Sequence, residues 1–140
     1  MNFLIKNTIP FIFIILAGCS GQEKNKKGIL EISYKAETRG SFINIDFKDS
    51  SLVLKSTIGD TSIVLSKVQV INLKSITSKI KLSEIGNLIA PTNERYRDAA
   101  LIGSFTIKKN DTSYVSSNFD HGSPPKEIQE LYDVLHKYLK

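Results

Sequence analysis

The residues best suited to chemistry form two charged groups, Glu94, Arg95, Arg97 and Asp98 in a polar stretch, and Asp120 with His121 further along the chain. Arginine side chains can hold a carboxylate or a phosphate through paired hydrogen bonds, and an aspartate beside a histidine could serve acid-base chemistry. If the two groups met in space, they would make a small-ligand or hydrolytic site. That site would use Arg95, Arg97, Asp98 and His121.

The same residues have a structural interpretation, which the sequence favours. Neighbouring side chains on an extended segment point apart, and the chain contains no HExxH, no GxSxG and no Gly-rich phosphate loop. We expect a local network to fix the polar loop, formed by Arg95, Arg97 and Asp98. A second set is expected to satisfy the start of the last helix: Asp120, His121 and Ser123.

Function must be argued from an assembled site, so the sequence predicts a protein that is not an enzyme and has no catalytic residue, cofactor or metal site. His136 is expected at the surface or boundary of the last helix, and two histidines alone do not make a metal site. The tyrosines are expected between sheet and helix with their hydroxyls in water, although they could form a binding surface. The candidates for contact with a partner remain Arg95, Arg97, Asp98, Asp120 and His121.

Strands must position these residues, because hydrophobic and polar residues alternate from residue 29 onward. This period of two is typical of half-buried strands. The first two expected strands contain Leu30, Ile32 and Tyr34, and then Ile43, Ile45 and Phe47. Turn residues separate two more, Leu52 to Lys55 and Ser62 to Leu65. The pattern predicts an antiparallel meander of about four strands.

A middle helix is expected within Lys67 to Ile89, because apolar residues recur there at intervals of three and four: Val70, Leu73, Ile76 and Ile80. Ser83 could cap a second short helix. Pro91 then disfavours helix at the residue before it. Residues 90–100 read as a polar loop.

The C-terminal part predicts a second hairpin and a last helix. Leu101 to Ile107 alternate, and a turn leads into a strand from Thr112 to Phe119. Ser123 is placed to cap the helix, with Pro124 at its first position. One face of the helix is apolar: Ile128, Leu131, Tyr132, Leu135, Tyr138 and Leu139. Packing this C-terminal helix on the sheet would complete a two-layer α+β domain.

The N-terminal stretch from Phe11 to Cys19, FIFIILAGC, is an apolar run that ends in two small residues and the chain's only cysteine. Lys6 precedes it, so the order of charge, apolar middle and small residues is that of a secretory signal. Leu16 to Cys19 resemble the lipobox of bacterial lipoproteins. The resemblance implies cleavage before Cys19, a diacylglyceryl group on its thiol, and an acyl chain such as palmitate on its new amine.

The alternative is a spanning helix or an ordinary secretory signal, with Cys19 an incidental thiol. A spanning helix needs about 20 apolar residues, roughly twice the length of this run. We therefore expect residues 1–18 to be a signal peptide, residues 19–28 the lipidated cysteine and a flexible tether, and residues 29–140 one α+β domain. Ser20 replaces the Asp that, in the enteric-type sorting rule, retains lipoproteins in the inner membrane, so the resemblance favours the outer membrane.

The charge of the chain is modest, +5, or +4 once Lys6 is removed with the signal. Three lysines follow the lipid site, Lys24, Lys26 and Lys27. Each could gain about 1 kcal/mol against an anionic membrane surface. Nucleic acid is not an expected partner, since the chain reads as exported and its basic residues do not interleave with surface aromatics.

The C-terminal tail resembles small uncharacterised bacterial lipoproteins with an FDHGxPP segment, here Phe119 to Pro125. More distantly, the order of strands, middle helix, hairpin and last helix is similar to emfourin-type inhibitors of thermolysin-like metalloproteases. Those inhibitors tend to carry a paired glycine in the first hairpin, where this chain has only Gly40. We expect a membrane-anchored lipoprotein whose domain is a non-catalytic protein-binding module, with a protease among the implied partners. The alternatives are the small-ligand or hydrolytic protein above and a structural envelope component.

Overall fold

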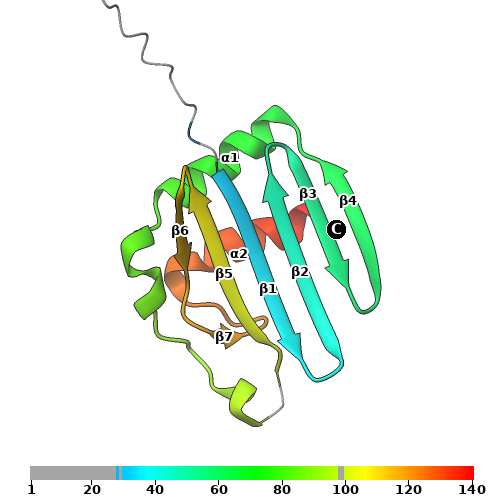
Figure 1. The fold of residues 1–140 in the computed structure, drawn as a ribbon, viewed down its shortest axis with the longest axis vertical. Coiled ribbons are helices and arrows are strands. Elements are labelled where there is room, and N and C mark those ends of the chain that lie inside the picture. Colours follow the sequence, from blue (N-terminus) through cyan, green and yellow to red (C-terminus); the bar gives the residue numbers. More distant parts are fainter. Residues whose placement is uncertain (1–27, 29, 98–99) are drawn as a thin grey trace, which may run out of the picture.

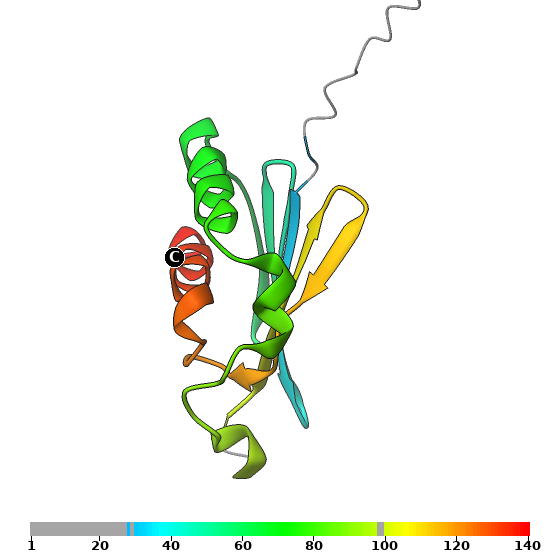
Figure 2. The ribbon, with the colours of Figure 1, turned by 90° about the vertical axis from the view of Figure 1, so that its left-hand side faces the viewer.

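The computed structural model of the chain describes residues 28, 30–97 and 100–140. The expected signal peptide, Cys19 and the tether up to residue 27 lie outside the described residues, as does Asp98. Within the described part, one antiparallel sheet carries two α-helices on the same face (Figures 1 and 2). The expected two-layer α+β fold is therefore confirmed.

Within the described part, the predicted meander supplies four of the seven strands of this sheet. Its strands are β1 (Leu30–Thr38), β2 (Ser41–Lys48), β3 (Ser51–Ser56) and β4 (Gly59–Val64). Tight turns join them, and Gly40 and Asp49 supply the left-handed backbone that two of these turns need, with φ of 87° and 57°. The strands lie in the order β4-β3-β2-β1, and the second hairpin continues the same sheet beyond β1.

The second hairpin consists of β5 (Ile102–Lys109) and β6 (Thr112–Val115), and β5 lies antiparallel to β1. The sequence predicts one strand from Thr112 to Phe119, and this is wrong. Ser116 turns inward, where its hydroxyl accepts the Phe105 amide, and Ser117 donates its amide to the Ile85 carbonyl. Pairing with β5 resumes only at the two-residue strand β7 (Phe119–Asp120).

The middle helix α1 (Lys67–Ser78) begins at a capping box, in which the Ser66 hydroxyl and the Gln69 side chain each accept the other residue's amide. Leu73 and Ile76 are buried, as the helical spacing predicts. The predicted second helix is the short 3-10 helix η1 (Leu82–Asn87). Ser83 lies inside η1 and caps nothing, so that expectation is wrong. The polar loop contains another 3-10 turn, η2 (Glu94–Arg97).

The last helix, α2 (Lys126–Tyr138), starts two residues later than predicted. Pro125 is the residue before the helix and is extended, with ψ of 147°. Because Pro125 also disfavours the helical region for Pro124, the predicted start cannot form. Ser123 is not the cap either, since Pro125 occupies the cap position and no side chain makes a capping hydrogen bond to α2.

The core lies between the sheet and the helices. Tyr34, Phe47, Phe105 and Phe119 are among its fully buried side chains, and the apolar stripe of α2 covers them. The opposite face of the sheet is polar and carries a Ser33–Asp46 hydrogen bond of 2.6 Å. This one-sided burial explains why apolar and polar residues alternate along β1 and most of β2. Figure 1 shows α1 at the end of the sheet where β1 begins.

Candidate functional site

The first candidate, the charged loop, is tied to β7 by a buried ion pair. Arg95 Nη1 lies 3.1 Å from Asp120 Oδ1, and their side chains are only 8% and 3% exposed. The carboxylate also accepts the amides of Glu94 and Arg95, at 2.7 and 2.9 Å, and the Thr92 hydroxyl. Asp120 therefore caps η2, not the start of α2 as predicted. Arg95 in turn pairs with a residue 25 positions away, and it also makes the expected kind of local contact, because the same Nη1 donates to the Thr92 carbonyl at 2.6 Å.

The electrostatics of Asp120 fit this structural role. Burial alone would raise the pKa of Asp120, but the hydrogen bonds from Thr92, Arg95 and Glu94 outweigh it and lower the pKa to about 2. The donors occupy both carboxylate oxygens. This carboxylate is therefore poorly placed to accept a proton from a substrate. Arg97 lies exposed at the end of η2, and Asp98 is outside the described residues.

His121 faces a different part of the molecule. The Tyr34 hydroxyl lies 2.7 Å from His121 Nδ1, and the Tyr132 hydroxyl lies 3.3 Å from the same atom. The structure thus brings Arg95 and Asp120 together but places His121 in a separate cluster. The prediction that His121 satisfies the start of α2 is wrong, because its ring bonds to tyrosines of β1 and α2.

This histidine-tyrosine cluster, formed by Tyr34, His121, Tyr132 and His136, is partly buried. The His136 ring packs against Tyr132 at a tilt of 32°, with ring centroids 4.1 Å apart, and its Nδ1 lies 2.8 Å from the Tyr132 carbonyl. A carbonyl can only accept, so the neutral His136 ring carries its proton on Nδ1. Within the described part, the buried Nε2 of His136 has no hydrogen-bond partner. Burial, and then the positive charge that His136 carries when it is protonated, lowers the pKa of His121.

Tyr34 corrects a further expectation. Its side chain is fully buried and its hydroxyl bonds to His121 rather than to water. Burial is the main reason that its pKa is raised above the ordinary value for tyrosine. His121 and His136 border a hollow of about 230 Å³ whose other walls are mostly aliphatic. The described residues include no group of three or more His, Cys, Asp or Glu that could hold a metal ion.

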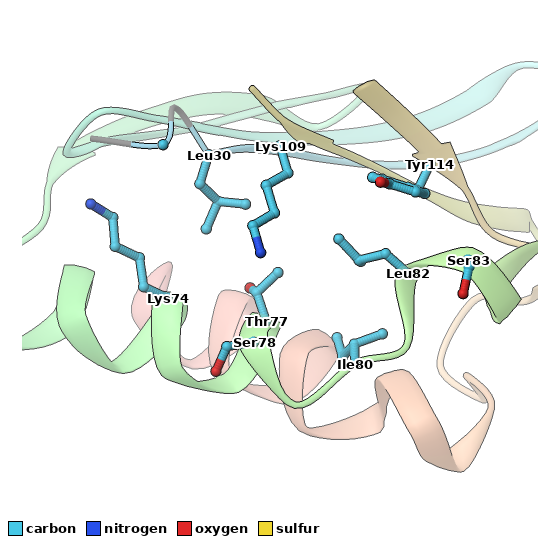
Figure 3. A pocket seen from close by; sticks show the side chains of 10 residues that line it. Leu30, Lys74, Thr77, Ser78, Ile80, Leu82, Ser83, Lys109 and Tyr114 are labelled. Atoms are coloured by element: carbon cyan, nitrogen blue, oxygen red, sulfur yellow. The ribbon is translucent and has the colours of Figure 1, made fainter. Parts of the chain in front are cut away.

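A larger cleft, of about 540 Å³, lies between α1, η1 and the end of the sheet (Figure 3). Its lining residues are Gly28, Leu30, Lys74, Thr77, Ser78, Ile80, Leu82, Ser83, Lys109 and Tyr114. Two lysines and several apolar side chains therefore share one concave surface, with no acidic residue among them. In Figure 3 the Lys109 side chain extends from the sheet into the space above Thr77.

The two lysines give the cleft a positive charge. Among residues 28, 30–97 and 100–140, neither Lys74 nor Lys109 forms an ion pair. An ammonium group without a carboxylate beside apolar walls favours an anionic group with an apolar portion. Sequence reasoning missed both lysines, because Lys109 reads as a turn residue and Lys74 as part of a solvated helix face. Only the crossing of α1 over the end of the sheet brings them together.

Comparison with known proteins yields no match, since no family model fits the chain and neither curated proteins nor solved structures are detectably similar to it. Across residues 28, 30–97 and 100–140, none of the helices combines the length and apolarity needed to cross a bilayer.

Proposed function

We propose that the protein is a bacterial envelope lipoprotein, held on a membrane by lipid on Cys19, with the outer membrane favoured. Its domain binds a protein partner through non-covalent contacts and carries out no chemistry. The signal sequence and the lipobox-like LAGC segment support the anchor. The lysine-bearing cleft supports the binding role.

The cleft is the observation that carries the proposal. Its volume of about 540 Å³ falls within the range of about 300–1,000 Å³ typical of binding pockets. Leu30, Ile80 and Leu82 supply apolar wall, while Lys74 and Lys109 supply positive charge. We infer that the occupant is an acidic segment of the partner with at least one apolar side chain.

The contacts around the charged groups favour binding over hydrolysis. Each carboxylate oxygen of Asp120 accepts a backbone amide of η2. His121 lies in another part of the fold, where its ring bonds to two tyrosines. A general base needs access to a proton on its substrate. No contact in the described residues joins these groups in a common pocket, so the small-ligand or hydrolytic alternative gains no support from them.

Affinity capture of the lipidated protein from native membranes tests the proposal. We expect Lys74→Glu with Lys109→Glu to lose a partner that the wild type retains, because two positive charges in the cleft become negative. Lys137→Glu is the matched control, since Lys137 is exposed on α2 and does not line the cleft. Mass spectrometry of the captured chain should show acyl mass on Cys19.

The same proteins test the resemblance to protease inhibitors. Purified wild type and the double lysine variant would be assayed against a thermolysin-like metalloprotease. Inhibition that the double variant loses would make a protease the partner of the cleft. An unchanged list of captured proteins in the double variant would refute the cleft as the binding site, and an intact signal peptide without acyl mass would refute the anchor.

A further inference from the structure

The outward face of α1 exposes apolar side chains that the core does not need. Val68 and Ile71 are 75% and 66% exposed, whereas Leu73 and Ile76, on the other side of the helix, are buried. A spacing of three residues places Val68 and Ile71 side by side on the helix surface. We call Lys67, Val68 and Ile71 the outer face of α1.

The charge of this helix is of one sign. α1 reads KVQVINLKSITS, which contains two lysines and no acidic residue. Lys67 lies in the first turn, where the partial positive charge of the helix N-terminus adds to that of its ammonium group. Apolar side chains beside positive charge are the groups through which a helix can contact the interface of an anionic membrane.

The described chain begins at the same end of the molecule. Gly28 lines the cleft together with Lys74 and Ser78 of α1. The nine residues from Ser20 to Gly28 span at most about 32 Å when fully extended. A lipid on Cys19 would therefore keep α1 within a few nanometres of the bilayer, so that even a weak contact is favoured by high local concentration.

We propose that the outer face of α1 docks on an anionic lipid surface, which orients the domain on the membrane; this rests on the lipid anchor of the proposed function. The opposite end of the sheet then points away from the bilayer. That end includes Ile58 in the turn between β3 and β4, because Ser56 pairs with Gly59 there while Ser51 pairs with Val64 near α1.

Site-specific fluorescence tests the orientation on the full lipidated chain. Ile71→Cys would be labelled with an environment-sensitive dye, since the Cys19 sulfur is a thioether after lipidation. Ile58→Cys is the matched control, an isoleucine that is 98% exposed at the far end of the sheet. The proteins would be reconstituted into vesicles of phosphatidylethanolamine with or without phosphatidylglycerol. Val68→Cys gives a second labelling position on the outer face of α1. Circular dichroism would confirm that each variant is folded.

We expect the Ile71 dye to shift to shorter wavelength in vesicles with phosphatidylglycerol and to be quenched by a lipid-borne quencher, while the Ile58 dye does neither. Introducing Lys67→Glu into the labelled Ile71→Cys protein, or raising the salt concentration, should reduce the wavelength shift, because the attraction is partly electrostatic. Equal emission from the two positions would overturn the proposal. The proposal would also be overturned if the wavelength shift depended on the amount of protein per vesicle and not on phosphatidylglycerol. That result would indicate that a second copy of the chain covers this face.

Failure of the anchor is distinguishable from failure of docking. If mass spectrometry shows no acyl group, the lipid anchor fails on its own. The labelled Ile71→Cys chain with Cys19→Ser is then mixed with excess anionic vesicles. A blue shift there supports docking by α1 alone, and its absence overturns docking.

Discussion

Replacing Asp120 by Asn should destabilise the protein more than replacing its partner Arg95 by Met. Asp120 is 2% exposed and accepts hydrogen bonds from the Thr92 hydroxyl, two amides and the Arg95 guanidinium. Asn keeps one acceptor oxygen and presents an NH₂ group to the other donors, so buried donors lose their partner. It also leaves the Arg95 charge buried without an anion.

The magnitude follows from these contacts. Removing one member of a buried ion pair typically costs about 3–5 kcal/mol in the free energy of unfolding, and we expect Asp120→Asn to fall in this range. Arg95→Met leaves the carboxylate with three donors, so its cost should be lower, about 1–3 kcal/mol. Arg97→Met is the control, since Arg97 is exposed on the same turn and should change stability by less than about 0.5 kcal/mol.

Acid titration gives an independent readout. The folded pKa of Asp120 is about 2, against about 3.9 for an unperturbed aspartate. A lowered folded pKa means that the ionised carboxylate stabilises the protein above the unfolded pKa, and that this contribution is lost as the pH falls from about 4 towards 2. Asp120→Asn should remove this part of the acid sensitivity.

Urea unfolding of the detergent-solubilised protein, monitored by circular dichroism, measures each variant against wild type. A loss for Asp120→Asn below about 1 kcal/mol would refute the reasoning, because a surface pair would cost no more. An Arg95→Met loss that equals or exceeds it would also refute it. That result would mean that the guanidinium, not the cap of η2, dominates the site.

Three further contacts, two of them at least partly buried, lead to predictions of their own. Because burial lowers the pKa of His121, stability should be complete above the unfolded pKa of about 6.5 and fall as the pH drops below it; His121→Gln should flatten this part of the unfolding profile. Gly103→Ala should cost about 1–3 kcal/mol in urea unfolding, since its Cβ would lie 2.9 Å from the Tyr34 hydroxyl oxygen. Ser66→Ala should cost about 1 kcal/mol by the same measurement, because the α1 capping box loses its hydroxyl acceptor, and Ser66→Thr should recover most of it.

The fold follows closely from sequence periodicity. One face of the sheet is buried and the other is polar, so apolar residues alternate with polar ones along β1 and, from Ile43 onward, along β2. Both strands can therefore be predicted from the sequence. The stripe of α2 is equally clear, because Ile128, Leu131 and Leu135 all face the sheet and are fully buried.

Local boundaries were less predictable, because they depend on tertiary partners. The strand expected from Thr112 to Phe119 breaks where Ser117 donates to Ile85 of a distant 3-10 turn. Ser123 and Pro124 have the residue types of a helix start, but the second proline, Pro125, delays α2 by two residues. This delay is a local effect that the Pro124–Pro125 pair itself encodes.

The charged residues show most clearly what the sequence alone determines. It places Arg95, Asp120 and His121 in polar segments outside long strands and helices, and it indicates that neighbouring side chains will diverge. It does not say where they go, because a hydrogen bond between Asp120 and η2 depends on chain crossings rather than on spacing. The cleft is a tertiary feature for the same reason, since Lys74 and Lys109 have no relation in sequence until α1 crosses the end of the sheet. Side-chain alternation is a local property that each strand carries in its own residues, whereas a binding surface is assembled from segments that only folding makes neighbours.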